Sequence, residues 1–230
     1  MLDRAATKLL RPGLEAAARG LARVGLHADH VTLIGFGIGL AAALSIAFEQ
    51  FIAGLLLLLV SRLCDGIDGA LARLTAPTDR GSFLDITLDF LFYASIPLAF
   101  AVARPAVNAL PAAVLLAAFI GTATTFLAFA TLAAQRGMTS APRPTTYVVR
   151  PPWGRETLGA ARRLFLMSAG YPDKGIYYLG GLTEATETLT CFALMCLWPA
   201  LFAPFAYGFA ALCGLTILMR LWAGWRAFSA

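Results

Sequence analysis

Long apolar runs constrain the fold of this chain more than any other feature of its sequence. A helix needs about 20 apolar residues to cross a bilayer. Six runs approach or exceed that length, at residues 31–48, 51–73, 82–103, 108–134, 175–198 and 204–225. Charged residues make up only 13% of the chain, about half the share of roughly 25% in a soluble domain. The sequence therefore predicts an all-α integral membrane protein with six transmembrane helices.

The first 25 residues differ from these runs. They carry five basic side chains and have no continuous apolar core, so they are not typical of a cleavable signal. Leucines recur among them at helical spacing, which predicts an N-terminal amphipathic helix at the membrane interface, with its cations near anionic head groups. We expect one membrane domain over residues 1–230, with this helix at 1–25 and a long loop at 135–174.

The basic residues alternate between connections. Five precede the first apolar run and seven fall in the fourth connection, whereas Glu49–Gln50 and residues 199–203 have none. This asymmetry places both termini and the long loop in the cytoplasm, and we expect the inner membrane of a bacterium. Positive cytoplasmic loops account for the formal net charge of +5, so no nucleic-acid partner is needed.

Two further patterns are structural. The stretch GFGIG at 35–39 lies inside an apolar run with no strand before it, so its glycines predict close helix packing rather than a nucleotide-binding loop. The four cysteines lie in apolar runs without CxxC spacing, and His27 and His30 have no further ligand type near them in the sequence. We therefore expect buried reduced thiols and no zinc site.

One stretch, CDGIDGALARLTAPTDRGSFLDITLDF at 64–90, is unusually acidic for an apolar chain. Asp65 and Asp68 are three residues apart, and Asp85 and Asp89 are four apart, so each pair shares one face of a helix. A short turn near residues 75–80 joins the two helices, which makes them antiparallel neighbours. The four carboxylates are therefore expected to converge near the cytoplasmic ends of both helices.

Four converging carboxylates with no cation between them would repel one another. Hard oxygen ligands suit Mg²⁺ or Mn²⁺, and two such ions could clamp a pyrophosphate during phosphoryl transfer. Gly66 and Gly69 would let a ligand approach the helix backbone, and Arg73 could bind a phosphate bidentately. The alternative, ion pairs in a solvated turn, suits Asp79 and Arg80. It does not suit Asp85 and Asp89, because carboxylates within apolar runs are generally functional.

The same residues resemble the signature of a known family. Asp65-Gly-Ile-Asp68-Gly69-Ala-Leu-Ala-Arg73, followed by Gly81, Asp85 and Asp89 at fixed spacing, is similar to the motif of the CDP-alcohol phosphotransferases. The resemblance implies transfer of a substituted phosphate from a CDP-linked donor to an alcohol, with release of CMP, two divalent ions and a homodimer. It also implies the six spans and the N-terminal interfacial helix.

The resemblance also implies roles for single residues. Asp65, Asp68 and Asp85 would bind the metal ions, and Asp89 would be the general base close to these ions and a further ligand. Gly69 and Arg73 would help to hold the CDP moiety. Thr32 stands where many members have a Pro-Asn-x-x-Thr stretch, but Ala28-Asp29 replaces Pro-Asn here.

The leading functional prediction is a phospholipid-synthesising transferase that moves a phosphatidyl group from CDP-diacylglycerol to an alcohol acceptor. One alternative uses a CDP-linked small alcohol, of the choline or ethanolamine type, as donor to a lipid. A prenyltransferase would need a second Asp-rich motif on another helix pair, which the sequence lacks. An ion-coupled membrane carrier is the non-enzymatic alternative, and the absence of an inverted repeat argues against it.

The acceptor is less well defined by the sequence. Family branches that use phosphorylated acceptors often carry Lys or Arg after the last motif aspartate, where this chain has Phe90. Other basic residues could substitute: Arg62, Arg80, Arg136 or Lys174. In the fifth apolar run, Glu184 and Glu187 are expected to form an acceptor pocket with Lys174 and Arg80. Alternatively, these acids are buried by pairing with Arg220 or Arg62.

Overall fold

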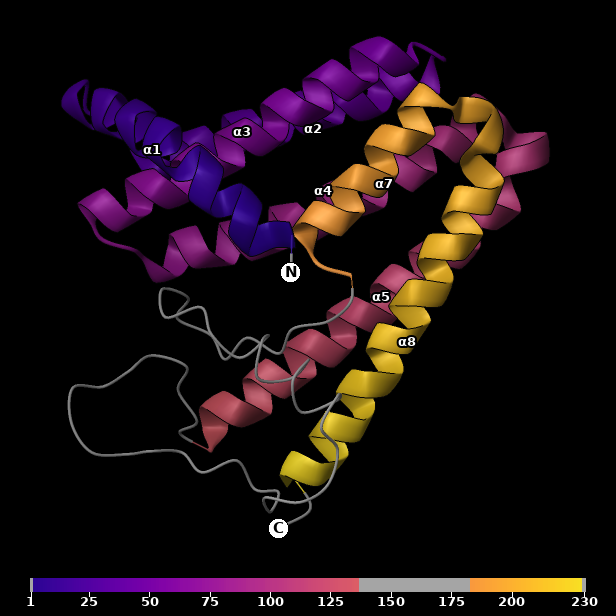
Figure 1. The fold of residues 1–230 in the computed structure, drawn as a ribbon. Helices are drawn as coiled ribbons and strands as arrows, with labels where there is room; N and C mark the ends of the chain where they lie inside the picture. Colours follow the sequence, from indigo (N-terminus) through magenta and orange to yellow (C-terminus); the bar gives the residue numbers. More distant parts are fainter. Residues whose placement is uncertain (1, 137–182, 229–230) are drawn as a thin grey trace. The chain divides into compact units, whose positions relative to one another are not determined.

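The computed structural model describes residues 2–136 and 183–228, and all the regular structure in these two segments is helical. The helices are α1 (Leu2–Arg23), α2 (Ala28–Ala47), α3 (Phe51–Thr75), α4 (Asp79–Ala103), α5 (Pro105–Gln135), α7 (Ala185–Leu197), the 3₁₀ helix η1 (Pro199–Leu201) and α8 (Phe202–Phe228) (Figure 1). The all-α prediction is confirmed for this part of the chain. Lys174 and nearly all of the predicted 135–174 loop lie outside the described residues.

Helices occupy all six predicted positions, although the first residues of the fifth, 175–182, lie outside the described part. Four described stretches are long and apolar enough to cross a membrane: Ala28–Ala47, Asp79–Ala103, Pro105–Gln135 and Pro199–Phe228. The charged α3 and the shorter α7 are not among them. The chain is therefore an all-α membrane protein, while the count of six spans and the interfacial position of α1 stay predictions.

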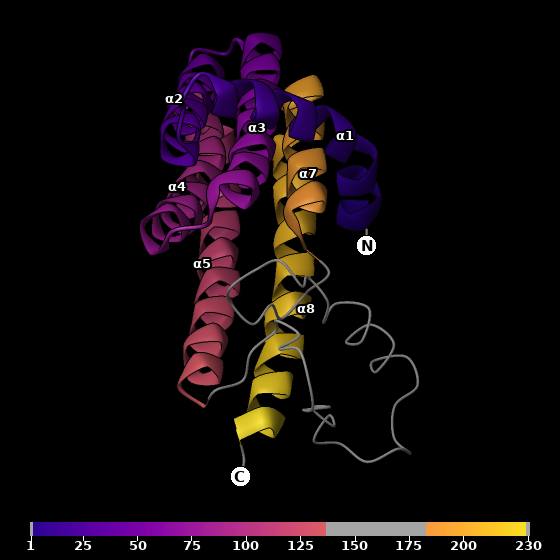
Figure 2. The same ribbon diagram turned by 90° about the vertical axis from the view of Figure 1, so that its left-hand side faces the viewer.

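The chain forms two compact parts, which are described separately. The first contains Leu2–Phe119 and Ala185–Ala210. Within it, α2 packs against α3 and α4, and α1 packs against α3 (Figure 1; Figure 2). A small apolar core joins α1, α2 and α3, with four buried residues: Ala18, Val31, Ala70 and Leu71.

Glycines permit the close approach of α2 to its neighbours. A methyl group on Gly35 would lie 2.8 Å from Cys64 Cβ, and one on Gly39 would lie 2.7 Å from a ring carbon of Phe92. Real Cβ atoms do not approach this closely. The prediction that the GFGIG glycines serve helix packing is therefore confirmed for Gly35 and Gly39, whereas a methyl group on Gly37 would have no such neighbour within 4 Å.

The second part contains Ile120–Glu184 and Ala211–Ala230. Its described helices are the C-terminal halves of α5 and α8, which lie side by side (Figure 1; Figure 2). A methyl group on Gly121 would lie 2.5 Å from Ile217 Cδ1. The buried Arg220 donates a hydrogen bond from Nη1 to the carbonyl of Thr122, at 2.9 Å.

Candidate metal centre

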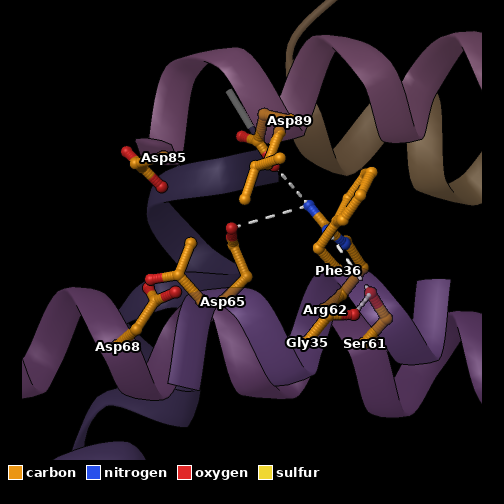
Figure 3. Close-up of a pocket in the computed structure, with 10 residues that line it drawn as sticks. Gly35, Phe36, Ser61, Arg62, Asp65, Asp68, Asp85 and Asp89 are labelled. Atoms are coloured by element: carbon orange, nitrogen blue, oxygen red, sulfur yellow. Dashed lines mark hydrogen bonds and ion pairs between the residues drawn. The ribbon is translucent and has the colours of Figure 1, made fainter. Parts of the chain in front are cut away.

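A short turn sets the positions of the two acidic helices in the first part. Residues 76–78 separate α3 from α4. Thr78 caps α4, because its side-chain oxygen accepts a hydrogen bond from the Gly81 amide at 3.0 Å. The turn brings the C-terminal half of α3 beside the N-terminal half of α4, and carboxylates of both helices face one pocket (Figure 3).

Three of the four motif carboxylates form a compact cluster. Asp65, Asp68 and Asp85 each offer a ligand oxygen within 4.8 Å of the other two. Asp68 is only 4% exposed, and its Oδ2 atom has no hydrogen-bond partner among the described residues. Asp85, by contrast, is exposed. The convergence that the residue spacing predicted is therefore present, and the cluster is open toward Asp85.

The chemistry of this cluster fits a hard divalent cation. An unsatisfied buried carboxylate oxygen is costly, and neighbouring carboxylates make it more so. A divalent ion among Asp65, Asp68 and Asp85 would remove both costs. Carboxylate oxygens are the ligands that Mg²⁺ and Mn²⁺ prefer, and no His or Cys in the described part of the chain belongs to the cluster.

Asp89 lines the same pocket but already has a cationic partner. Its Oδ1 atom accepts a hydrogen bond from Nη1 of Arg62 at 2.6 Å, and the same nitrogen lies 3.6 Å from Asp65 Oδ1 (Figure 3). A side-chain cation therefore lies between these two carboxylates, a contact that the sequence analysis did not propose. The sequence contained a signal for the approach to Asp65 alone, because Arg62 precedes Asp65 by three residues and so shares its helix face.

Arg62 is held from several sides. Its side chain is 11% exposed, and its guanidinium lies 3.9 Å from the centre of the Phe92 ring. Nη2 donates to Ser61 Oγ at 3.4 Å, and Ser61 Oγ donates to the Gly35 carbonyl at 2.7 Å. The cation–π contact and the hydrogen bonds both favour a fixed position of the guanidinium.

Of the other predicted binding residues, some line this pocket and some do not. Thr32 lines it, and its hydroxyl donates to the Ala28 carbonyl at 3.0 Å. Gly66, Gly69 and Arg73 are not among the lining residues. A methyl group on Gly69 would meet only the end of Arg73, at 3.6 Å. A methyl group on Gly66 would instead press against Leu14 of α1.

One predicted acceptor residue, Arg80, forms an ion pair outside the carboxylate pocket. Arg80 is 78% exposed on its side chain, and its Nη2 atom lies 2.5 Å from Asp29 Oδ2. It does not line the carboxylate pocket. Glu184 precedes α7, and Glu187 lies in the first turn of that helix; both are partly buried. Lys174 lies outside the described residues. The acceptor pocket therefore stays a prediction.

Comparisons with known proteins agree with the motif. A sequence model of the CDP-alcohol phosphatidyltransferase family matches residues 26–222. The inner membrane protein YnjF of Escherichia coli K12 is 44% identical over 225 residues, which cover 98% of this chain and 96% of that protein. The archaetidylinositol phosphate synthase of Pyrococcus horikoshii is 38% identical over 97 residues, which cover 42% of this chain and 51% of that enzyme.

Solved structures share the fold. The phosphatidylinositol phosphate synthase of Mycobacterium tuberculosis with CDP-DAG bound matches with a TM-score of 0.59 and 22% identity, over 92% of this chain and 93% of that one. The same enzyme in complex with manganese and citrate matches with a TM-score of 0.53, over 92% and 88%. Taken with the family match over 26–222, these findings show that the chain is a transferase enzyme that belongs to the CDP-alcohol phosphatidyltransferase family.

Proposed function

We propose that this enzyme transfers a phosphatidyl group from CDP-diacylglycerol to an alcohol acceptor and releases CMP, as a step of phospholipid synthesis. The observation that carries the proposal is the convergence of Asp65, Asp68 and Asp85 within 4.8 Å, with Asp89 in the same pocket. The structural relative with CDP-DAG bound supports this choice of donor.

The carboxylates would hold two divalent ions, Mg²⁺ or Mn²⁺, when the donor is bound. Asp65, Asp68 and Asp85 are the proposed ligands, and Asp89 is a further one. Manganese in the solved relative supports a divalent metal. Bound ions would neutralise the charge of the pyrophosphate and of the departing CMP phosphate. The exposed side of the cluster at Asp85 is where a water-soluble nucleotide can enter.

Asp89 is the proposed general base. An alcohol has a high pKa, so a positioned carboxylate that accepts its proton during attack accelerates the reaction. The Asp89 side chain is 32% exposed, which leaves room for an acceptor hydroxyl beside it. The hydrogen bond from Arg62 would keep the carboxylate oriented toward the pocket.

Three other residues are proposed to bind the CDP moiety. The open backbone at Gly69 allows close approach of a ligand, and the guanidinium of Arg73 can bind phosphate oxygens. Thr32 offers a hydroxyl at the wall of the pocket. Gly66 was predicted to share the role of Gly69, and the approach of Leu14 to it supports an additional part in helix packing.

The acceptor site and the cellular setting complete the proposal. Glu184, Glu187, Lys174 and Arg80 are the proposed acceptor residues. We place the enzyme in a bacterial inner membrane as a homodimer, with both termini and the active site cytoplasmic. The name of the Escherichia coli relative supports the inner membrane, and the distribution of basic residues supports the orientation.

Release of labelled CMP from CDP-diacylglycerol tests the function. The purified enzyme should release CMP with Mg²⁺ and an acceptor alcohol present, and Asp89→Asn should abolish the release. Asp79→Asn is the matched control, because Asp79 is exposed at the start of α4 and does not line the pocket. Activity with CDP-choline and diacylglycerol in place of CDP-diacylglycerol would reverse the donor assignment. Mg²⁺-dependent binding without any CMP release would instead favour a carrier.

A further inference from the structure

We propose that Arg62 is a built-in cation of the carboxylate pocket, which holds Asp89 and limits the substrate-free site to one divalent ion. The inference rests on the proposed metal site and adds an order of binding to it. Entry of a second ion would then require the CDP-linked donor. Arg62 lies outside the aspartate motif, three residues before it.

The geometry divides the four carboxylates into two groups. Asp65, Asp68 and Asp85 form the cluster in which one cation can contact three carboxylates. On the other side, Asp89 is engaged by Arg62 at 2.6 Å. Asp65 faces both groups, since Arg62 Nη1 lies 3.6 Å from its Oδ1. The place that a second ion would take, between Asp65 and Asp89, is thus next to a guanidinium (Figure 3).

The guanidinium is not easily displaced from this place. Its side chain is only 11% exposed, and the central carbon of its guanidinium lies over the Phe92 ring, 3.9 Å from the ring centre. The hydrogen bond from Ser61 to the Gly35 carbonyl ties the neighbouring hydroxyl to α2. An arginine keeps its charge at all physiological pH values. A cation held in this way resists replacement by a metal ion from solution.

Charge determines how many ions such a site can hold. In the substrate-free pocket, four carboxylates face one guanidinium, so one divalent ion leaves a net charge of about −1 if all four are ionised. A second divalent ion would make the pocket positive and would be repelled by both the first ion and Arg62. The pyrophosphate of a CDP-linked donor brings negative charge and additional oxygen ligands. The donor would therefore recruit the second ion.

Counting bound Mn²⁺ tests this inference without measuring turnover. The full-length enzyme in detergent is titrated with Mn²⁺, and free Mn²⁺ is measured by electron paramagnetic resonance. The wild type should bind one ion per chain, and two when CDP-diacylglycerol is added. Arg62→Met should bind two ions without the donor, or bind the first at least about tenfold more tightly, because it keeps the apolar stem and loses the charge.

Two variants serve as controls. Arg62→Lys keeps a positive charge and should still bind one ion. Arg104→Met removes a guanidinium whose partner, Glu49, lies outside the pocket, and it should also bind one ion. If Arg62→Met does not fold, as judged by gel filtration, Arg62→Gln and the wild-type count with and without donor still test the idea.

The outcomes separate this inference from the proposed function. Two results would overturn the role of Arg62 and leave the metal site intact. One is binding of two ions by the substrate-free wild type. The other is an unchanged number and affinity of bound ions in folded Arg62→Met or Arg62→Gln. Absence of any Mn²⁺ binding by the wild type, with or without donor, would instead overturn the metal site itself. One ion rising to two with donor, together with the gain in Arg62→Met, is the result that the structure leads us to expect.

Discussion

A methyl group on Gly66 would lie 3.0 Å from Leu14 Cδ1, so α1 and α3 pack together through this glycine. Gly69, in the same motif, has open space around the corresponding position apart from the end of Arg73. Two motif glycines three residues apart therefore have different neighbours. One meets a helix of the protein, and the other is accessible to a ligand.

This difference predicts opposite effects for two alanine substitutions. Gly69→Ala should raise the KM for CDP-diacylglycerol at least several-fold and leave the melting temperature nearly unchanged. Gly66→Ala should destabilise the enzyme by about 1 kcal/mol, near the low end for overpacking because the end of Leu14 can move. Melting in detergent and initial rates at varied donor concentration measure both effects. If Gly69→Ala left the KM for CDP-diacylglycerol unchanged and Gly66→Ala raised it, the roles of the two glycines would be reversed.

The buried oxygen of Asp68 predicts a strong dependence on metal. Asp68→Asn keeps the shape of the side chain and removes its charge, so Mn²⁺ affinity and CMP release should both fall. Loss of a residue that only supports a metal ligand costs roughly 10–100-fold, and loss of a ligand itself should cost more. Chelation of the wild type should abolish CMP release, and added Mg²⁺ should restore it. Asp79→Asn should behave as the wild type. Unchanged Mn²⁺ affinity in a folded Asp68→Asn variant would remove this residue from the metal site.

A substitution at Glu184 is expected to affect the binding of the acceptor without affecting the binding of the donor. If it belongs to the acceptor pocket, Glu184→Gln should raise the KM for the acceptor several-fold and leave the KM for CDP-diacylglycerol unchanged. Glu49→Gln is a matched control, because Glu49 lies in the loop between α2 and α3 and does not line the carboxylate pocket. An equal loss of affinity for donor and acceptor would argue for a structural role of Glu184. A panel of phosphorylated and unphosphorylated alcohols in the same assay would identify the acceptor.

The sequence predicted features that depend on local spacing. The apolar runs gave the positions of the helices, and the intervals between Asp65 and Asp68 and between Asp85 and Asp89 gave the faces that converge. A short turn restricted how the two acidic helices can lie, so little else was needed to bring the carboxylates together. Family resemblance added roles for these residues but no new geometry.

Features that depend on the rotation and packing of distant helices were not predicted. Arg62 contacts Asp89, which is 27 residues away on another helix, and the sequence does not specify which cation α4 will face. Arg80 turns toward Asp29, 51 residues away, instead of the pocket. Gly66 and Gly69 look equivalent in the motif until α1 covers one of them. Each case required knowledge of a neighbour from elsewhere in the chain.

An ion pair away from the metal site predicts a pH-dependent contribution to stability. Arg104 donates to Glu49 Oε2 from Nη2 at 2.6 Å and from Nε at 3.1 Å, which links the connection after α2 to the residue between α4 and α5. This hydrogen bond is the main cause that lowers the pKa of Glu49 below its ordinary value of 4.5. Both side chains are well exposed, so the contribution is small.

The sign of the effect follows from the lowered pKa. A carboxyl group with a lower pKa in the folded state stabilises that state at pH values above 4.5, and the contribution is lost as the pH falls through the folded-state value. Glu49→Gln should therefore melt slightly below the wild type at about pH 7, and the gap should close below about pH 4. CMP release at neutral pH should be unchanged. A gap of the same size at about pH 3, where the carboxyl is protonated, would show that the ion pair is not its source.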